Sequence, residues 1–175
     1  MSESDDTLEV PADFDSFYVA HWAPVAALAY TLCGSRPVAE ELAQDAFTAV
    51  YRDWQRVSRL DRPDAWVRRV ASNAAISVLR RRDREKRARL RLAAGPDRGG
   101  DQRTVLPAEH EHFWAEVRRL PTRQAQAVAL HYLEDRSVGD IAAVLDCAES
   151  TVKVHLHRGR STLAERLGPH EEVTR

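Results

Sequence analysis

The stretch SVGDIAAVLDCAESTVKVHLHRGR, residues 137–160, predicts two short helices joined by a tight turn. Ser137 is a suitable N-cap, and apolar residues recur after it at the spacing of one helix face. The turn falls at Asp146, where a left-handed backbone is expected and where Asp is tolerated better than most residues. This pattern is typical of a DNA-binding helix-turn-helix, whose second helix enters the major groove.

The second of these helices is expected to present donors and cations on its outer side. Phosphates need cations and base edges need donors, so this face has the chemistry that DNA requires. Ala148 stands where a capping hydroxyl is frequent, so the start of this helix should be held less firmly. The alternative is a hairpin with a merely solvated polar face. The predicted DNA-facing residues are Ser150, Thr151, Lys153, Val154, His157, Arg158 and Ser161.

Composition favours an all-α fold. Ala, Leu, Arg and Glu are abundant among the 175 residues, whereas glycine and aromatic residues are few. The formal net charge of −1 hides an asymmetry, because residues 1–16 carry only acidic charges and residues 80–91 are densely basic. Since a local patch and not the total charge attracts nucleic acid, the basic segment is a second candidate for DNA contact.

The sequence predicts neither a membrane protein nor a secreted one. The acidic N-terminus lacks the apolar core of a signal peptide, and no apolar run approaches the length of a membrane span. Cys33 and Cys147 lie far apart and do not suggest a disulfide framework. A cytoplasmic protein is therefore expected.

Three helices are predicted in the N-terminal half. The first runs from about residue 12 to residue 33, and Pro24 inside it predicts a kink or a break. The second runs to about residue 54, and its polar outer face is either solvated or a docking surface for another protein. After a loop at residues 56–62, a third and strongly basic helix begins at Pro63.

The segment after the third helix loses its apolar period. Residues 83–108 include the Gly- and Pro-rich run AAGPDRGGDQ, which has no candidate core positions. The run REKRARLRL before it (84–92) is either part of this segment or an extension of the third helix. A second helical unit follows and contains the helix-turn-helix. The sequence therefore predicts two small helical domains joined by a flexible linker.

No enzymatic or metal site is indicated. His110 and His112, like His155 and His157, are two residues apart and point away from each other on a helix, so no metal or other cofactor is expected. The sequence has no phosphate-binding loop, nucleophile constellation or pair of catalytic carboxylates. The chain is therefore expected not to be an enzyme.

Three segments, in their order and spacing, resemble bacterial RNA polymerase sigma factors of the extracytoplasmic-function (ECF) type, of the sigma-E-like subgroup. AEELAQDAFTAVYRDW (39–54) resembles the segment that docks on the clamp helices of the polymerase β′ subunit. RPDAWVRRVASNAAISVLRRR (62–82) resembles the segment that melts and reads the −10 element. LPTRQAQAVALHYLEDRSVGDIAAVLDCAESTVKVHLHRGRSTL (120–163) resembles the domain that reads the −35 element.

The resemblance implies a domain organisation. The expected parts are a disordered acidic N-terminus (1–11), sigma domain 2 (12–85), a flexible linker (86–108), sigma domain 4 with the helix-turn-helix (109–168) and a tail (169–175).

The resemblance also implies residue roles. The loop at residues 58–64 falls where the family captures an unstacked base, and Asn73 lies at a position next to that pocket. From the residues alone, Asn73 either satisfies a buried contact or faces DNA. The residues implied for −10 recognition are Ser58, Arg59, Asp61, Arg62, Asn73, Arg80, Arg81 and Arg82. The residues implied for polymerase docking are Leu42, Gln44, Asp45 and Phe47.

The implied function is that of a promoter-specificity subunit, which directs transcription initiation at promoters with −35 and −10 elements. The implied partners are core RNA polymerase, through its β′ clamp helices and β flap, and promoter DNA; many such proteins also bind an anti-sigma factor. Two weak DNA readers on one polymerase gain affinity through their tether. The alternatives are a helix-turn-helix transcriptional regulator that is not a polymerase subunit, and a non-DNA interaction module built from two helical bundles.

Overall fold

The computed structural model describes residues 13–92 and 108–168, and its regular elements there are all α-helices, which confirms the all-α prediction. The expected N-terminal extension, the expected tail and most of the expected linker lie outside the described residues. The helices are α1 (Phe14–Cys33), α2 (Arg36–Arg52), α3 (Trp54–Val57), α4 (Pro63–Leu92), α5 (Ala108–Arg118), α6 (Thr122–Glu134), α7 (Val138–Leu145) and α8 (Glu149–Leu167).

Local signals set the limits of α1. The carboxylate of Asp13 accepts a hydrogen bond from the backbone N–H of Ser16 and caps the first turn. At the other end, Gly34 adopts φ 71°, and its N–H bonds to the carbonyl of Tyr30. The helix is continuous through Pro24, so the predicted break is absent. Burial of Val25 and its neighbours on the inner face holds the helix together across the proline.

The second predicted helix divides into two. α2 ends at Arg52, and the four residues of α3 follow at once, so residues 56 and 57 are helical and not part of a loop. The short helix forms because Val57 is completely buried and anchors the turn. The irregular connection to α4 is therefore shorter than predicted.

The third predicted helix, α4, is longer than its apolar period indicated. It begins at Pro63, as predicted, and continues to Leu92, so residues 86–92 of the expected linker are helical. Polar, straight-chain residues such as Arg, Lys and Glu favour a helix even without an apolar face, which explains the extension. Residues 93–107 of the expected linker are outside the described chain.

The predicted helix-turn-helix is confirmed in α7 and α8. Ser137 and Asp140 form a reciprocal capping box at the start of α7. Asp146 ends α7 in the predicted left-handed conformation, with φ 55°. α8 starts at Ala148 without a side-chain cap, as its missing hydroxyl predicted.

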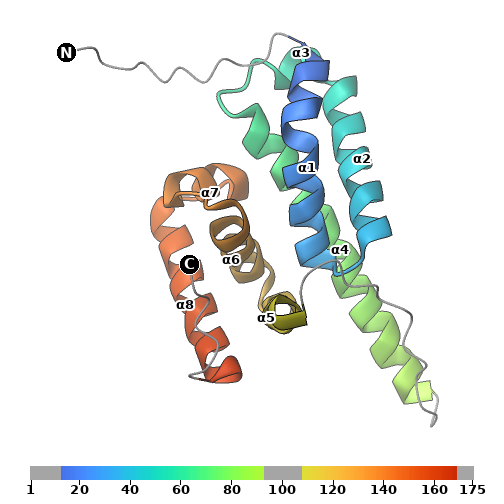
Figure 1. The fold of residues 1–175 in the computed structure, drawn as a ribbon, viewed down its shortest axis with the longest axis vertical. Helices are drawn as coiled ribbons and strands as arrows, with labels where there is room; N and C mark the ends of the chain where they lie inside the picture. Colours follow the sequence, from blue (N-terminus) through green and yellow to red (C-terminus); the bar gives the residue numbers. More distant parts are fainter. Residues whose placement is uncertain (1–12, 93–107, 169–175) are drawn as a thin grey trace.

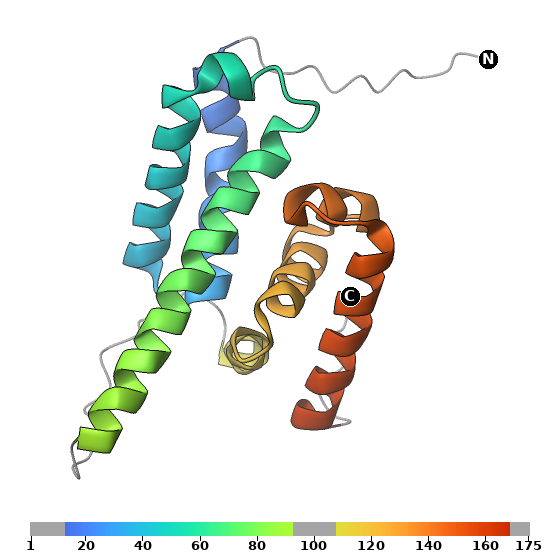
Figure 2. The same cartoon turned by 180° about the vertical axis from the view of Figure 1, so that it is seen from behind.

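The helices form two groups that pack against each other (Figures 1 and 2): α1 to α4, and α5 to α8. One apolar core, which includes Phe17 and Val57, lies within the first group. A second core is shared by both groups, because Leu28 of α1 and Ile76 of α4 join the same cluster as Leu130 of α6. α8 lies on the side of the second group that faces away from α1. Within the described residues, none of the helices has the length and apolar character that a membrane crossing requires.

We expect Gly159→Ala to destabilise the protein, although alanine favours a helix more than glycine does. An added Cβ at position 159 would lie 2.9 Å from Cγ2 of Val128, because α8 and α6 approach closely there. Overpacking of this kind costs about 1–3 kcal/mol. The measurement is the free energy of unfolding from urea titration.

The matched control is Gly139→Ala in α7. Its added Cβ would lie 3.3 Å from Oε1 of Glu149, the end of a flexible side chain that can move aside, and at an ordinary contact distance of 3.8 Å from Oγ of Ser137. This variant should be neutral or gain up to about 1 kcal/mol from helix propensity. Equal effects of the two substitutions would contradict the close α6–α8 contact.

Candidate nucleic-acid interface

The outer face of α8 is free for a partner. All seven residues predicted to face the −35 element are exposed, and they share one side of the helix: Ser150, Thr151, Lys153, Val154, His157, Arg158 and Ser161. The opposite side carries Val152, Leu156 and Leu163, which are buried against the rest of the second group. The amphipathic pattern thus places donors, cations and one aliphatic side chain together on a convex surface.

The electrostatics of this face favour an anionic partner. Residues 150–164 contain no acidic side chain. His155 lies at the edge of the face, and burial, followed by the positive charges of Arg123 and Arg158, lowers its pKa. Arg123 and Arg158 thus place positive charge next to this face and add to the effect of burial on the imidazole.

The loop between α3 and α4 presents part of the set predicted for the −10 element. Arg59 and Asp61 are exposed there, and Ser58 is half-buried. Arg62 is also half-buried, but its guanidinium is engaged: Nη2 lies 2.8 Å from Oδ1 of Asp140 in α7, and Nε donates to Asp64 at 3.2 Å. One predicted DNA contact is thus held by the second group of helices.

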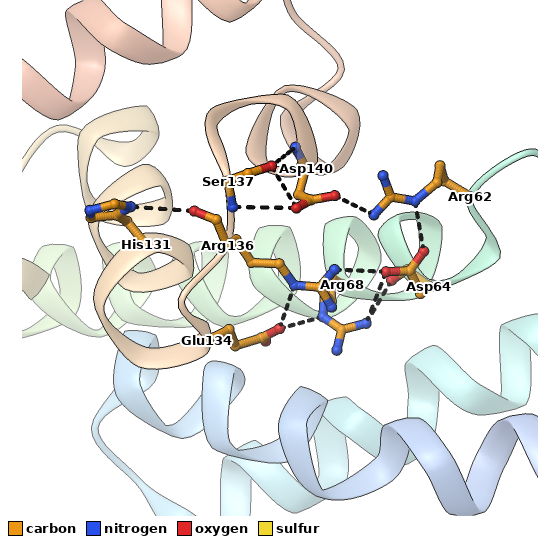
Figure 3. Close-up of polar contacts among 8 residues, drawn as sticks. All are labelled: Arg62, Asp64, Arg68, His131, Glu134, Arg136, Ser137 and Asp140. Carbon is orange, nitrogen blue, oxygen red and sulfur yellow. Dashed lines mark hydrogen bonds and ion pairs between the residues drawn. The ribbon is translucent and has the colours of Figure 1, made fainter. Parts of the chain in front are cut away.

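A buried ion-pair network joins α4 to the end of α6 next to this loop (Figure 3). Nε of Arg68 lies 2.6 Å from Oε2 of Glu134, and the two side chains are 3% and 8% exposed. Arg136 pairs with the same carboxylate at 3.1 Å and with Oδ2 of Asp64 at 3.0 Å. Charged side chains of the first group and of the second group are therefore connected in one continuous cluster of ion pairs.

Further along α4, two more predicted −10 residues contact the second group. Nε2 of Gln126 in α6 donates to Oδ1 of Asn73 at 2.8 Å and to the hydroxyl of Ser72 at 3.2 Å. A guanidinium N–H of Arg80 donates to the carbonyl of Leu120. Asn73 therefore does satisfy a contact with a buried group, while its own side chain stays on the surface.

The remaining predicted −10 residues are Arg81 and Arg82, and both are exposed. Nε of Arg81 lies 2.9 Å from Oε1 of Glu85, one turn further along α4. The structure thus divides the −10 set: Arg62, Asn73 and Arg80 are engaged between the two groups, and the others face solvent or are half-buried.

The predicted polymerase-docking residues lie on α2, but one of them is not on the surface. Gln44 and Asp45 are exposed and Leu42 is half-buried. Phe47 is only 2% exposed and packs against the rings of Phe17 and Trp22, so its prediction as a docking residue is wrong. Its position in the sequence matched the docking segment, but its side chain fills the core.

Sequence reasoning missed several residues that join the two groups, among them Arg68, Gln126, Glu134 and Arg136. Their partners are 53 to 72 positions away in the chain, so no local pattern reveals them. The one available signal was Gln126, an amide within the apolar face of its helix, since a buried amide needs a hydrogen-bond partner.

Family models identify two parts of the chain. The model described as Sigma-70 region 2 matches residues 17–85, and the model described as Sigma-70, region 4 matches residues 111–163. The ECF RNA polymerase sigma factor SigE of Mycolicibacterium smegmatis is 30% identical over 174 residues, covering 92% of this chain and 64% of that protein. The RNA polymerase sigma-E factor of Streptomyces avermitilis is 30% identical over 129 residues, covering 74% of this chain and 70% of that protein.

Solved structures with a similar fold cover both groups of helices. The sigma factor RpoE in complex with the anti-sigma factor NepR from Bartonella quintana matches with a TM-score of 0.67 at 24% identity, over 91% of this chain and 99% of that one. CnrH in complex with the cytosolic domain of CnrY matches with a TM-score of 0.63 at 21% identity, over 90% of this chain and 89% of that one. At these identities the likeness concerns the fold.

Acid should weaken the network in Figure 3. Burial alone would raise the pKa of Asp64, but Arg62, Arg136 and Arg68 together hold it below its ordinary value of 3.8. The stabilisation from Asp64 is therefore present above pH 3.8, its unfolded value, and is lost as the pH falls through the lower folded value. We expect the free energy of unfolding to fall as the pH drops below 3.8, and Asp64→Asn to reduce that fall.

The control for this titration is Asp45→Asn, which removes an exposed carboxylate on α2. Within the described residues Asp45 lies in no ion pair, so this variant removes one carboxylate without touching the network and controls for the loss of a negative charge. If the free energy of unfolding of Asp64→Asn depended on pH as steeply as that of the wild type, the role given to Asp64 in the network would be contradicted.

Proposed function

The chain belongs to the extracytoplasmic-function family of bacterial RNA polymerase sigma factors, and we propose that it is a promoter-specificity subunit that directs transcription initiation by core polymerase. The observation that carries the proposal is the pairing of an exposed recognition helix, α8, with a separate basic helix, α4, in one chain. A regulator that acts alone would need only the first of these.

Each surface has a distinct role in this function. The exposed side of α8 reads the −35 duplex, with Lys153 and Arg158 on phosphates and base edges. The loop after α3 and the basic side of α4 take the −10 strand as it is displaced, where stacking and charge are what a single strand offers. Gln44 and Asp45 on α2 contact core polymerase. Each DNA contact is weak alone, and the shared polymerase makes them act together.

The closed pairing of the two groups has to open for −10 recognition. Arg62 and Arg80 are bonded to Asp140 and to the Leu120 carbonyl, so a DNA strand reaches them only after those contacts break. In the free chain the second group therefore competes with DNA for the first. The outer face of α2 is exposed in the closed form, so core polymerase can bind there first. Core polymerase then drives the opening to the extent that it binds the open form more tightly than the closed one.

An anti-sigma factor belongs among the proposed partners, beside core polymerase and promoter DNA. One structure of similar fold contains a sigma factor with its anti-sigma factor NepR, and the other contains CnrH with the cytosolic domain of CnrY. A partner that binds the closed form better than the open one would deepen the competition, because a ligand shifts an equilibrium only through its differential affinity.

The function is tested by two variants that should fail in different ways. Lys153→Glu with Arg158→Glu reverses two charges on α8, and should abolish −35 binding while core polymerase still co-elutes with the chain in gel filtration. Asp45→Arg should impair co-elution and leave the circular dichroism spectrum unchanged. In vitro transcription with purified core polymerase across a promoter library measures the output. A chain that binds its operator fully without core polymerase would instead be a regulator.

The requirement for opening is tested by Asp64→Asn with Glu134→Gln. These changes leave Arg68 buried without a charged partner, which costs about 3–5 kcal/mol unless the groups separate and expose it to water. We expect the radius of gyration from small-angle scattering to rise and the apparent affinity for core polymerase to increase several-fold.

Arg36→Gln is the matched control for the opening experiment, since it breaks only the exposed Arg36–Glu40 pair within α2. This variant should have the radius of gyration and the apparent affinity for core polymerase of the wild type. An unchanged radius of gyration in the double variant would show that the ion pairs do not hold the groups together.

A further inference from the structure

The last third of α4 leaves the body of the molecule (Figures 1 and 2). The buried apolar residues of α4 end at Ile76, and the side chains from Arg84 to Arg91 are all exposed. The side chains from Arg84 to Arg91 lie beyond the set predicted for the −10 element, whose last member is Arg82. We call residues 82–91, which include Arg82, the arm.

The arm is strongly basic. Between residues 82 and 91 the sequence has six Arg or Lys residues and two acids, Asp83 and Glu85. Glu85 already pairs with Arg81 at 2.9 Å. A helix that is polar all round gains nothing from burial, and its like charges repel one another, so a polyanion would stabilise it.

The basic residues form two stripes and are not spread evenly. At 3.6 residues per turn, Arg84, Arg87 and Arg91 fall on one side of the helix. Arg82, Lys86 and Arg89 fall on roughly the opposite side. The strips between them hold Glu85 and Ala88 on one flank, and Asp83 and Leu90 on the other.

This two-sided arrangement matches the walls of a DNA groove. An α-helix with its side chains is about 10–12 Å across, and the major groove of B-DNA is about 12 Å wide with a phosphate strand on each side. A helix in that groove meets phosphates on both flanks at once. A flat anionic surface would use only one stripe and leave the other in solvent.

We propose that the arm lies in the major groove of duplex DNA, with one basic stripe on the phosphates of each strand. At 1.5 Å per residue it spans about 15 Å, or roughly four base pairs. Both basic stripes are directed at phosphates, which carry no sequence information, so we expect this contact to depend on charge more than on base sequence. The arm is exposed in the closed form, so this binding does not need the two groups to separate.

The test uses the full-length chain and a fluorescent duplex of scrambled sequence without promoter elements. Arg84→Gln, Arg87→Gln and Arg91→Gln are combined, because glutamine keeps the helix propensity of arginine and removes the charge. Each lost phosphate contact lowers the slope of log affinity against log salt by about 0.9, so the slope should fall by about 2.7. Arg82→Gln with Arg89→Gln, on the other stripe, should lower it by about 1.8.

Two comparisons make the result specific. A variant with Arg36, Arg52 and Arg119 changed to Gln has the same loss of charge on exposed residues elsewhere, and should keep the wild-type slope. Double-stranded RNA of the same sequence has a deep, narrow major groove that does not admit a helix, so arm variants and wild type should bind it with equal slopes.

An unchanged slope on DNA would overturn the contact, and an equal drop on double-stranded RNA would overturn insertion into the groove. Because the probe has no promoter and the assay has no polymerase, the outcome does not depend on the proposed function. A chain that failed to direct transcription could still pass this test.

Discussion

The buried ion pair between Arg68 and Glu134 is the contact on which the closed arrangement depends. Burial removes the hydration of both charges, and their attraction offsets that loss only when the geometry is good and the neighbouring partners are complete. Asp64 and Arg136 add partners from the two sides, and Oε1 of Glu134 stays buried without a hydrogen-bond partner among the described residues. The pair therefore fixes how the two groups align, while the shared apolar core, which includes Leu28 and Leu130, supplies most of the attraction.

An interface of this kind suits a pairing that must separate. When the groups part, both charges of each ion pair become hydrated. The electrostatic free energy lost on opening is therefore small compared with the cost of a substitution that leaves one charge buried without its partner. If the closed form outnumbers the open form by a hundred to one, the opening partner must supply about 2.8 kcal/mol, since each factor of ten is about 1.4 kcal/mol. That is a small fraction of the roughly 12 kcal/mol of a nanomolar interface.

The parts of the structure that sequence reasoning predicted are those fixed by neighbouring residues. The capping box at Ser137, the left-handed Asp146 and the terminating Gly34 each depend on backbone chemistry within one turn of helix. Periodicity separated the inner and outer faces of α8 for the same reason. Phe47 shows the limit of matching a family segment by position. The same helix carries residues that face a partner and residues that face the core, and the match by position does not separate them. The side chain of Phe47 is buried because its packed neighbours surround it.

The interface between the groups could not be predicted in this way. Whether Arg62 meets solvent, DNA or Asp140 depends on residues 78 positions away and on how the two helical groups dock. The sequence of a basic helix does not show whether its arginines bind phosphates or carboxylates, because both partners offer anionic oxygens. Gln126 alone broke a local rule, and it lies at the centre of the shared surface.

The closed form treats its two proposed DNA readers differently, and the physical demands of each explain why. Duplex DNA offers its −35 bases without distortion, so α8 can stay exposed at no cost. The −10 strand is available only when the duplex opens, which the free chain has no means to drive. Under the proposed function, the internal partners of Arg62, Asn73 and Arg80 would deny single strands a binding surface until core polymerase is bound. The polymerase that opens the DNA would then also release the residues proposed to hold it.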